Sequence, residues 1–325
     1  MSGWCEVRRC GGQVLVQDLG RSGLRHLGVS PGGVCDPRGV RIINALVGNE
    51  GGAAVLEIAF GGLELVFSDR RQVAWAGADV TVRCDQVSLP PGRLGTVAAG
   101  HRLRIGYARS GCRLWLAVSG GFDVPMVMGA KCTDVRSGFG GWEGRPLVVG
   151  DRLPLGPGDI VGLSGPSRWG ASEEWVSRGP EASGWQVAVI RGAQWECVHE
   201  KSRTAFLGET YTVTAEADRM GVRLQGTALQ FSVGEGPSEP VAPGTIQVPA
   251  SGQPIVLLTD ARTMGGYPRL AHVISPHLAR VAQWRTGDQV RFHLVDLAEA
   301  TRLADEEERE LAWFLAGVAL KRSRS

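Results

Sequence analysis

The sequence predicts a mainly β protein with few helices, divided into two domains. Its apolar segments are short and rich in β-branched residues, and apolar and polar residues alternate in them, as is typical of half-buried strands. Forty-seven glycines and 17 prolines indicate many turns between these strands. A chain of 325 residues is too long for one modest core, which favours two domains. Strands of this kind favour a sandwich or a barrel over alternating β-α units.

The predicted strands are spread along the whole chain. They cover residues 14–16, 63–67, 80–82, 114–118, 186–190, 246–248, 255–258 and 290–294. A glycine- and proline-containing stretch between the halves is the best candidate for a linker. The predicted organisation is therefore a first domain over 1–165, a linker over 166–184, a second domain over 185–295, and a C-terminal helix and tail over 296–325.

Two helices stand out from the strands. Asp36 is a suitable N-cap, Pro37 fits the first turn, and residues 40–47 carry an apolar stripe with roughly helical spacing. The second helix is predicted over 296–318. Its acidic run at 305–308 is most simply a solvated face, not a metal site.

Composition excludes several classes of function. The net charge is only +2, from 35 basic and 33 acidic residues, which gives no electrostatic footprint for nucleic acid. The seven cysteines are scattered and form no Cys-x-x-Cys pair, so zinc and thioredoxin-like interpretations fail. No signal peptide pattern and no run of about 18 apolar residues is present. We expect a cytoplasmic protein with reduced cysteines and no bound metal of its own.

Three segments carry polar residues where the strand pattern would place apolar ones. The first contains Gln17, Asp18 and Arg21; the second covers 217–224; the third covers 245–268. Polar groups at the ends of buried strands are candidates for binding or catalysis.

In the second segment, Arg219 and Arg223 stand on opposite sides of Gly221. A guanidinium fork matches a carboxylate or a phosphate, and Asp218 is close enough in sequence to pair with one of the arginines. Two interpretations stand: an anion-binding site, or a buried ion pair that holds a turn.

In the third segment, the strand over 255–258 ends in a polar loop. Gly265 and Gly266 allow positive φ angles, and a loop of that kind exposes N–H groups as an anion nest does. The hydroxyl groups of Thr263 and Tyr267 are further donors for a bound oxygen. The alternative is a plain turn that ends at the following proline.

Together these segments resemble one family, the KipA-type proteins, which are also called the C subunits of 5-oxoprolinase. The same module is related to the carboxyltransferase region of urea amidolyases and urea carboxylases. The resemblance runs over about residues 11–295 and rests on the order of seven motifs. They are "VQDLGRSGLRHLGV" (16–29), "LVGNEGGAAVLEIAFGGLEL" (46–65), "GADV" (77–80), "LAVSGGFDVP" (116–125), "ADRMGVRL" (217–224), "SEPVAPGTIQVPASGQPIVLL" (238–258) and "TMGGYP" (263–268).

The resemblance implies two cyclophilin-like β-barrel domains. It also implies the role of the C subunit in an ATP-dependent 5-oxoprolinase, which opens 5-oxoproline (pyroglutamate) to L-glutamate together with a KipI-like B subunit and an A subunit. ATP with Mg²⁺ would be a co-substrate of that complex. The chain has no Met-Lys-Met biotinyl site, so no biotin is expected on it. The alternatives are action on another amide or urea-like substrate, as in carboxyltransferases, or a KipA-like regulatory protein that antagonises a kinase inhibitor.

The chemistry that the resemblance implies suggests which residues act. A lactam is a poor electrophile, and phosphorylation of its oxygen needs cationic and N–H donors around the developing charge. The expected catalytic residues are Arg223, Thr263, Tyr267 and Asp218. The expected substrate- or nucleotide-binding residues are Arg219, Gln247, Gly265, Gly266, Gln17, Asp18 and Arg21. We expect one pocket to be lined by Arg219, Arg223, Gly265, Gly266 and Tyr267 together with Gln247 and Asp218, and Gln17, Asp18 and Arg21 either to join them or to face a partner protein.

The chain departs from the family pattern at two places. Relatives usually read Gly-Ser-Arg-Ser-Thr where residues 129–133 read Gly-Ala-Lys-Cys-Thr. Relatives usually have a glutamine where this chain has Arg262, and a threonine where it has Met264. A permanent cation in place of a neutral amide changes the local charge by one unit, so substrate identity is the open point of the resemblance.

Overall fold

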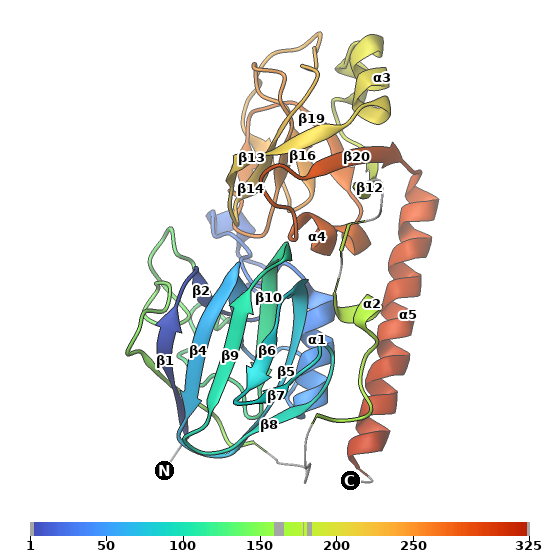
Figure 1. Cartoon of the computed structure of the whole chain (residues 1–325). Helices are drawn as coiled ribbons and strands as arrows, with labels where there is room; N and C mark the ends of the chain where they lie inside the picture. Colours follow the sequence, from blue (N-terminus) through green and yellow to red (C-terminus); the bar gives the residue numbers. More distant parts are fainter. Residues whose placement is uncertain (1–2, 159–165, 178, 181–183, 324–325) are drawn as a thin grey trace. The chain divides into compact units, whose positions relative to one another are not determined.

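A computed structural model describes residues 3–158, 166–177, 179–180 and 184–323 (Figure 1). The chain forms two compact units. Unit 1 comprises Met1–Arg21, Gly32–Gly179 and Glu310–Ser325, and unit 2 comprises Ser22–Pro31 and Pro180–Arg309. Neither unit is continuous in sequence, because the segment Ser22–Pro31 packs with the second half of the chain and the end of the last helix packs with the first half.

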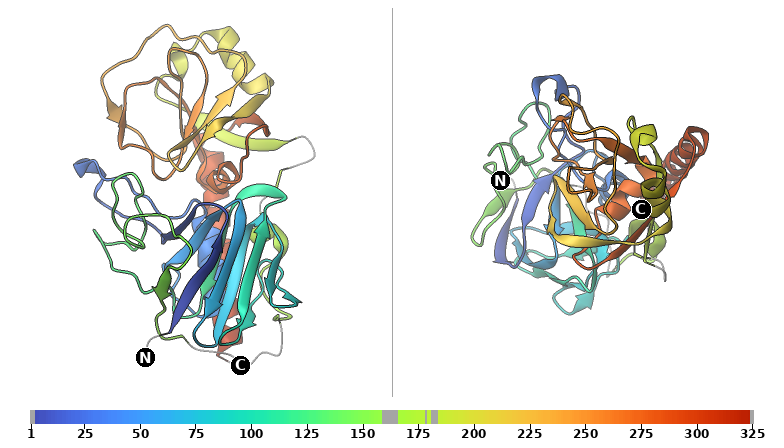
Figure 2. Two further views of the ribbon diagram at one scale, coloured as in Figure 1. Left: turned by 60° about the vertical axis from the view of Figure 1, so that its left-hand side comes forward. Right: turned by 90° about the horizontal axis from the view of Figure 1, so that it is seen from above.

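Unit 1 contains two antiparallel sheets that share one core. The six-stranded sheet has the order β11-β1-β4-β9-β6-β7, and the five-stranded sheet has the order β2-β3-β10-β5-β8. Strands of the first sheet run side by side in both Figure 1 and Figure 2. Apolar side chains from both sheets belong to one buried cluster, so the sheets pack face to face. The bounds are β1 Trp4–Cys10, β2 Val14–Gln17, β3 Val55–Ala59, β4 Gly61–Phe67, β5 Arg71–Asp79, β6 Val82–Cys84, β7 Val87–Ser88, β8 Gly95–Val97, β9 Arg102–Tyr107, β10 Ser110–Val118 and β11 Arg152–Pro154.

Unit 2 is built on a closed seven-stranded barrel with the order β12-β19-β16-β17-β14-β13-β20. The parallel pairing of β12 with β20 closes it. Phe206 stacks on Phe292 inside the barrel, with ring centroids 4.8 Å apart. A separate two-stranded ribbon, β15–β18, carries part of the "TMGGYP" loop. The bounds are β12 Trp185–Arg191, β13 Tyr211–Ala217, β14 Gly221–Gln225, β15 Glu239–Pro240, β16 Thr245–Gln247, β17 Ile255–Leu257, β18 Met264–Gly265, β19 Arg269–Val273 and β20 Gln289–Leu294.

The helices are few, as predicted. They are η1 Arg25–Leu27, α1 Pro37–Val47, α2 Glu173–Val176, η2 Trp195–Cys197, α3 Glu200–Gly208, α4 Ser275–Val281 and α5 Leu297–Arg322. Asp36 caps α1, because its Oδ1 accepts a hydrogen bond from the Gly39 N–H at 2.9 Å. None of the described helices combines the length and apolar composition needed to cross a membrane.

The structure confirms the predicted fold class, mainly β with few helices and a C-terminal helix, and the barrel is consistent with a cyclophilin-like fold. One predicted strand, 80–82, is wrong. The chain leaves the five-stranded sheet at Asp79 and joins the six-stranded sheet at Val82. Val80 and Val82 are both buried. The alternation of apolar residues at 80–82 therefore reflects burial where the chain crosses between the sheets, not a continuous strand.

The predicted linker, 166–184, packs on unit 1 over part of its length. Ser167 Oγ accepts a hydrogen bond from Leu94 N at 3.0 Å, and Ser177 Oγ donates to Gly77 O at 2.9 Å. Residues 178 and 181–183 of the predicted linker lie outside the described residues. Residues 166–177 therefore pack as part of unit 1 and do not form a free linker.

Candidate active site

A cavity of about 940 Å³ in unit 2 brings together six of the eleven predicted site residues. It lies among the β13–β14 hairpin, the strands β16 and β17, and the β15–β18 ribbon. Its volume suits a small-molecule ligand. The predicted residues that line it are Asp218, Arg223, Gln247, Gly265, Gly266 and Tyr267.

Asp218 holds the turn between β13 and β14. Its Oδ1 accepts hydrogen bonds from the backbone N–H groups of Met220 at 2.7 Å and Gly221 at 3.1 Å. The prediction that Asp218 pairs with an arginine is wrong. The tight turn brings backbone donors to the carboxylate at lower conformational cost than a long guanidinium side chain would require.

Arg223 lies at the exposed rim of the cavity. Its Nε is 2.8 Å from Glu216 Oε2, and the side chains are 53% and 74% exposed. The two residues flank the turn on neighbouring strands, so the pair is a cross-strand contact. Because water screens an ion pair this exposed, the pair contributes little to stability, and the Arg223 guanidinium can leave Glu216 to bind a ligand at a small cost in free energy.

Arg219 does not line the cavity. Its Nε is 2.8 Å from Asp260 Oδ2 and its Nη2 is 2.9 Å from Asp260 Oδ1, and Nη2 also donates to Thr259 Oγ1 at 3.1 Å. The side chain is only 6% exposed. Of the two interpretations of this segment, the buried ion pair holds for Arg219, with Asp260 as its partner.

Gln247 and Gly265 fit against each other in the cavity wall. The amide of Gln247 is buried, and its Nε2 donates to Tyr267 O at 3.3 Å. A Cβ atom added to Gly265 would lie 2.6 Å from that Nε2. Neither Gly265 nor Gly266 has a positive φ angle, so the predicted anion nest is wrong. Gly265 pairs with Glu239 in an extended ribbon, and it is the close packing of Gln247 that leaves no room for a side chain.

Arg262 and Tyr267 each bring a hydrogen-bond donor to the cavity. The Arg262 side chain is exposed, and it has no acidic partner among the described residues. The Tyr267 phenol is likewise without a hydrogen-bond partner in the described part of the chain. The cavity thus offers one uncompensated guanidinium, one phenol and one buried amide, a set that suits a small molecule with a carboxylate and an amide.

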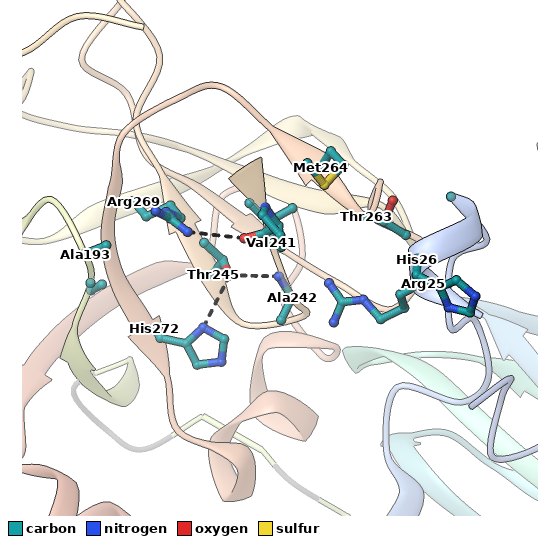
Figure 3. A pocket seen from close by; sticks show the side chains of 14 residues that line it. Arg25, His26, Ala193, Val241, Ala242, Thr245, Thr263, Met264, Arg269 and His272 are labelled. Carbon is teal, nitrogen blue, oxygen red and sulfur yellow. Dashed lines mark hydrogen bonds between the residues drawn. The ribbon is translucent and has the colours of Figure 1, made fainter. Parts of the chain in front are cut away.

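Thr263 lines a different cavity of unit 2, of about 780 Å³ (Figure 3). Its carbonyl accepts a hydrogen bond from Val241 N at 3.0 Å, which ties the loop to the segment after β15. Thr263 therefore faces away from the set formed by Gln247 and Tyr267. The second cavity is taken up below.

Gln17, Asp18 and Arg21 are buried in unit 1, where they hold the segment 131–133. Gln17 Nε2 donates to the carbonyl of residue 133 at 3.1 Å, and Arg21 Nη2 donates to the carbonyl of residue 132 at 2.6 Å. Asp18 Oδ2 accepts from the backbone N–H of residue 131 at 2.5 Å. These polar side chains thus fix the backbone of the segment in which the chain departs from the family pattern.

Sequence reasoning named Arg262 only as a departure from the family pattern and did not name Glu216 or Glu235, yet all three line the cavity with Arg223. A hairpin drawn around the 218–221 turn would have placed Glu216 opposite Arg223. No group of three or more His, Cys, Asp or Glu side chains in the described part of the chain is arranged to hold a metal ion.

Comparisons with known proteins agree with the geometry. The model of the carboxyltransferase domain, subdomain A and B, matches residues 27–294. The C subunit of the 5-oxoprolinase of Escherichia coli is 36% identical over 316 residues, which cover 95% of this chain and 98% of that protein. The C subunit of the 5-oxoprolinase of Haemophilus influenzae is 33% identical and is covered to 92%.

Solved structures show the same architecture. The urea amidolyase of K. lactis superposes with a TM-score of 0.89 at 26% identity, over 96% of this chain but only 20% of that protein. TTHA0988 superposes with a TM-score of 0.78 at 32% identity, over 90% of this chain and 56% of that one. The chain thus corresponds to about a fifth of urea amidolyase. It belongs to the family of carboxyltransferase domains with subdomains A and B, and within that family it is a homologue of the 5-oxoprolinase C subunits.

Proposed function

We propose that this chain is the C subunit of an ATP-dependent 5-oxoprolinase that opens 5-oxoproline to L-glutamate. The observation that carries the proposal is the end-to-end match to two proteins named as C subunits of 5-oxoprolinase, of which the chain covers 98% and 92%. The urea amidolyase of Saccharomyces cerevisiae, at 28% identity, is covered to only 18%. One subunit of a complex requires partners, and we propose a KipI-like B subunit and an A subunit, with ATP and Mg²⁺ as co-substrates of the complex.

The charge of the 940 Å³ cavity supports the lactam, not the nucleotide, as its ligand. Arg223 and Arg262 are set against Glu216, Asp218 and Glu235, so the lining carries no excess of positive charge for a triphosphate. The single carboxylate of 5-oxoproline, by contrast, matches the guanidinium of Arg262, which has no acidic partner among the described residues. We therefore place 5-oxoproline here and assign no ATP site to this chain.

The residues of the cavity have distinct roles in this proposal. Arg262 binds the substrate carboxylate as a charge-assisted pair. Gln247 Oε1, which accepts no hydrogen bond within the described part of the chain, accepts the lactam N–H. The Tyr267 phenol donates to the lactam oxygen, and Arg223 stabilises negative charge that develops at that oxygen.

ATP supplies the phosphoryl group that turns the lactam oxygen into a leaving group. Water then adds to the ring carbon, and the carbon–nitrogen bond breaks as the nitrogen takes up a proton, which leaves an acyl phosphate. A second water releases phosphate from this acyl phosphate, so the products are glutamate, ADP and phosphate. In this chain Arg223 and Tyr267 hold the oxygen in place, while the buried Gln247 fixes the ring nitrogen.

The test is release of glutamate from 5-oxoproline by this chain with its A and B partners, each component being omitted in turn. We expect glutamate only when all three subunits and ATP are present. An assembled complex that forms no glutamate would refute the proposal. Assembly is checked by co-elution of the subunits in gel filtration, so that a failure of chemistry is separated from a failure to associate.

A second candidate function is favoured by the TM-score of 0.89 to urea amidolyase over nearly the whole chain. In that case the chain would transfer a carboxyl group to urea or a related amide, which is the acceptor. The same preparation, given carboxybiotin and urea without 5-oxoproline, would then consume carboxybiotin. Consumption that depends on urea would support this function over the first.

A further inference from the structure

The cavity of about 780 Å³ in unit 2 has no role in the proposed function. It is lined by η1, by the segment that follows β15, and by β18 and β19. It shares only Val241 and Met264 with the candidate active site. The two cavities therefore adjoin the same β15–β18 ribbon but present different side chains.

The lining is positively charged. It contains two cations, Arg25 and Arg269, with the imidazoles of His26 and His272 beside them, and no aspartate or glutamate among the described residues. Arg269 is neutralised just outside the lining, because its Nη2 contacts Glu239 and its Nη1 donates to Pro240 O at 3.2 Å. One cation of this cavity is therefore already compensated within the protein.

Arg25 is the uncompensated cation. It comes from η1 and is half-buried, and its guanidinium has no hydrogen-bond or ion-pair partner among the described residues. Figure 3 shows its side chain extended toward the segment of Ala242 and Thr245, whereas the ring of His26 points the other way. A guanidinium held partly out of water without an acidic partner is costly unless an anion joins it.

Polar groups complete the wall near Arg25. The buried Thr245 Oγ1 accepts a hydrogen bond from Ala242 N at 3.1 Å and lies 3.3 Å from His272 Nδ1 (Figure 3). The hydroxyl of Thr263, which has no partner in the described part of the chain, lines the same cavity. Between them lie the apolar side chains of Val241, Ala242, Met264 and Ala271, so the cavity has one charged and one apolar part.

We propose that this cavity is a second binding site, for a small molecule that carries an oxyanion, with Arg25 as the charge partner of a carboxylate or phosphate and the hydroxyl of Thr263 as a further donor. The apolar lining takes the remainder of the ligand. This inference does not rest on 5-oxoprolinase activity, because it follows from the charge and the contacts of this cavity alone.

The test uses calorimetric titration of the full chain with two probes, inorganic phosphate and 5-oxoprolinate, which distinguish the two sources of an oxyanion. All titrations are made in the Arg262→Gln background, which removes the carboxylate partner of the candidate active site. Arg25→Gln then removes the charge of this cavity, Arg25→Lys keeps it, and Arg70→Gln, at an exposed arginine of unit 1, is the control. We expect at least one probe to bind in this background, with affinity reduced about tenfold or more by Arg25→Gln, reduced less by Arg25→Lys, and unchanged by Arg70→Gln. Binding of phosphate alone would identify a phosphate ligand, and binding of 5-oxoprolinate alone a carboxylate.

Three outcomes would overturn the proposal. They are no binding of either probe up to about 10 mM, affinities that Arg25→Gln leaves unchanged, and a loss of affinity in Arg70→Gln equal to that in Arg25→Gln. Circular dichroism of each variant shows that the fold is kept, which is expected because the Arg25 side chain forms no hydrogen bond or ion pair in the described part of the chain. The test needs neither partner proteins nor ATP, so its result is independent of whether the complex hydrolyses 5-oxoproline.

Discussion

Arg219 and Asp260 form a two-point ion pair, with Nε–Oδ2 and Nη2–Oδ1 distances of 2.8 and 2.9 Å. The pair joins the β13–β14 turn to the chain that follows β17. It lies beside the candidate active site without lining it. Arg219, which the sequence analysis expected to bind substrate or nucleotide, therefore stabilises the fold through this ion pair.

Replacing Arg219 with alanine should therefore destabilise the protein. The change leaves the Asp260 carboxylate without its main partner, and we expect the free energy of unfolding to fall by about 2–4 kcal/mol. Arg219→Lys should recover little of this, because one ammonium group does not match both carboxylate oxygens. Urea denaturation measures both changes. An unfolding free energy for Arg219→Ala equal to that of the wild type would contradict the structural role.

Replacing Arg223 with alanine should do the opposite, abolishing turnover while leaving stability unchanged. Arg223 pairs with Glu216 in the open, so we expect the free energy of unfolding to change by no more than about 0.5 kcal/mol. We expect ATP-dependent glutamate release by the assembled complex to be lost, because the charge at the lactam oxygen loses its cation. The control is Glu216→Gln, which removes the ion pair but keeps the guanidinium. Full turnover in Arg223→Ala would remove this residue from the site.

Replacing Gly265 with alanine should disturb Gln247. The new Cβ would lie 2.6 Å from Gln247 Nε2, so the amide must move and loses its hydrogen bond to Tyr267 O. We expect a loss of about 1–2 kcal/mol in unfolding free energy and reduced turnover. The matched control is Gly208→Ala, at the end of α3, where an added Cβ meets nothing within 4 Å. Equal effects of the two substitutions would show that the packing against Gln247 is unimportant.

The stability of the protein should fall as the pH is lowered through the ordinary titration range of histidine because of His272. Burial lowers the pKa of the His272 imidazole in the folded protein. Below about pH 6.5 the unfolded chain therefore takes up a proton that the folded chain does not, and protonation favours unfolding. The contribution to the slope is at most about 1.4 kcal/mol per pH unit.

The measurement is thermal or urea unfolding of the wild type and His272→Gln between about pH 7.5 and 5.5. We expect the variant to lose stability less steeply than the wild type as the pH falls. His26→Gln, which removes an exposed ring from the same cavity, serves as the control. A slope in His272→Gln as steep as that of the wild type would show that the buried ring does not couple to folding.

Local sequence was enough to predict the fold class, seven of the described strands and two of the described helices. Asp36 and Pro37 mark the start of α1 by a capping interaction that lies within one turn of chain. Two-residue alternation marks strands such as β4 and β20, because each has one buried face. The alternation failed at 80–82, where burial continues although the chain changes sheets.

The candidate site was predicted in part, since motif order located the loops but not the direction of their side chains. Gln247, Gly265 and Tyr267 do line one cavity, whereas Thr263, in the same loop as Gly265 and Tyr267, lines another. Along an extended strand, neighbouring side chains point to opposite faces. A shift of one residue in the assignment therefore moves a group from one cavity to the other.

The sequence by itself determined the mainly β class, the two helices and the family, because these depend on local periodicity, caps and motif order. Only the tertiary structure decided that Arg219 pairs with Asp260, 41 residues away, while Arg25 and Arg262 each line a cavity without an acidic partner in the described part of the chain. The partner of a charged side chain depends on strand order and register, which bring together residues far apart in the chain. An arginine stabilises the fold where the tertiary structure places a carboxylate beside it, and it is available to bind a ligand where no carboxylate lies close to it.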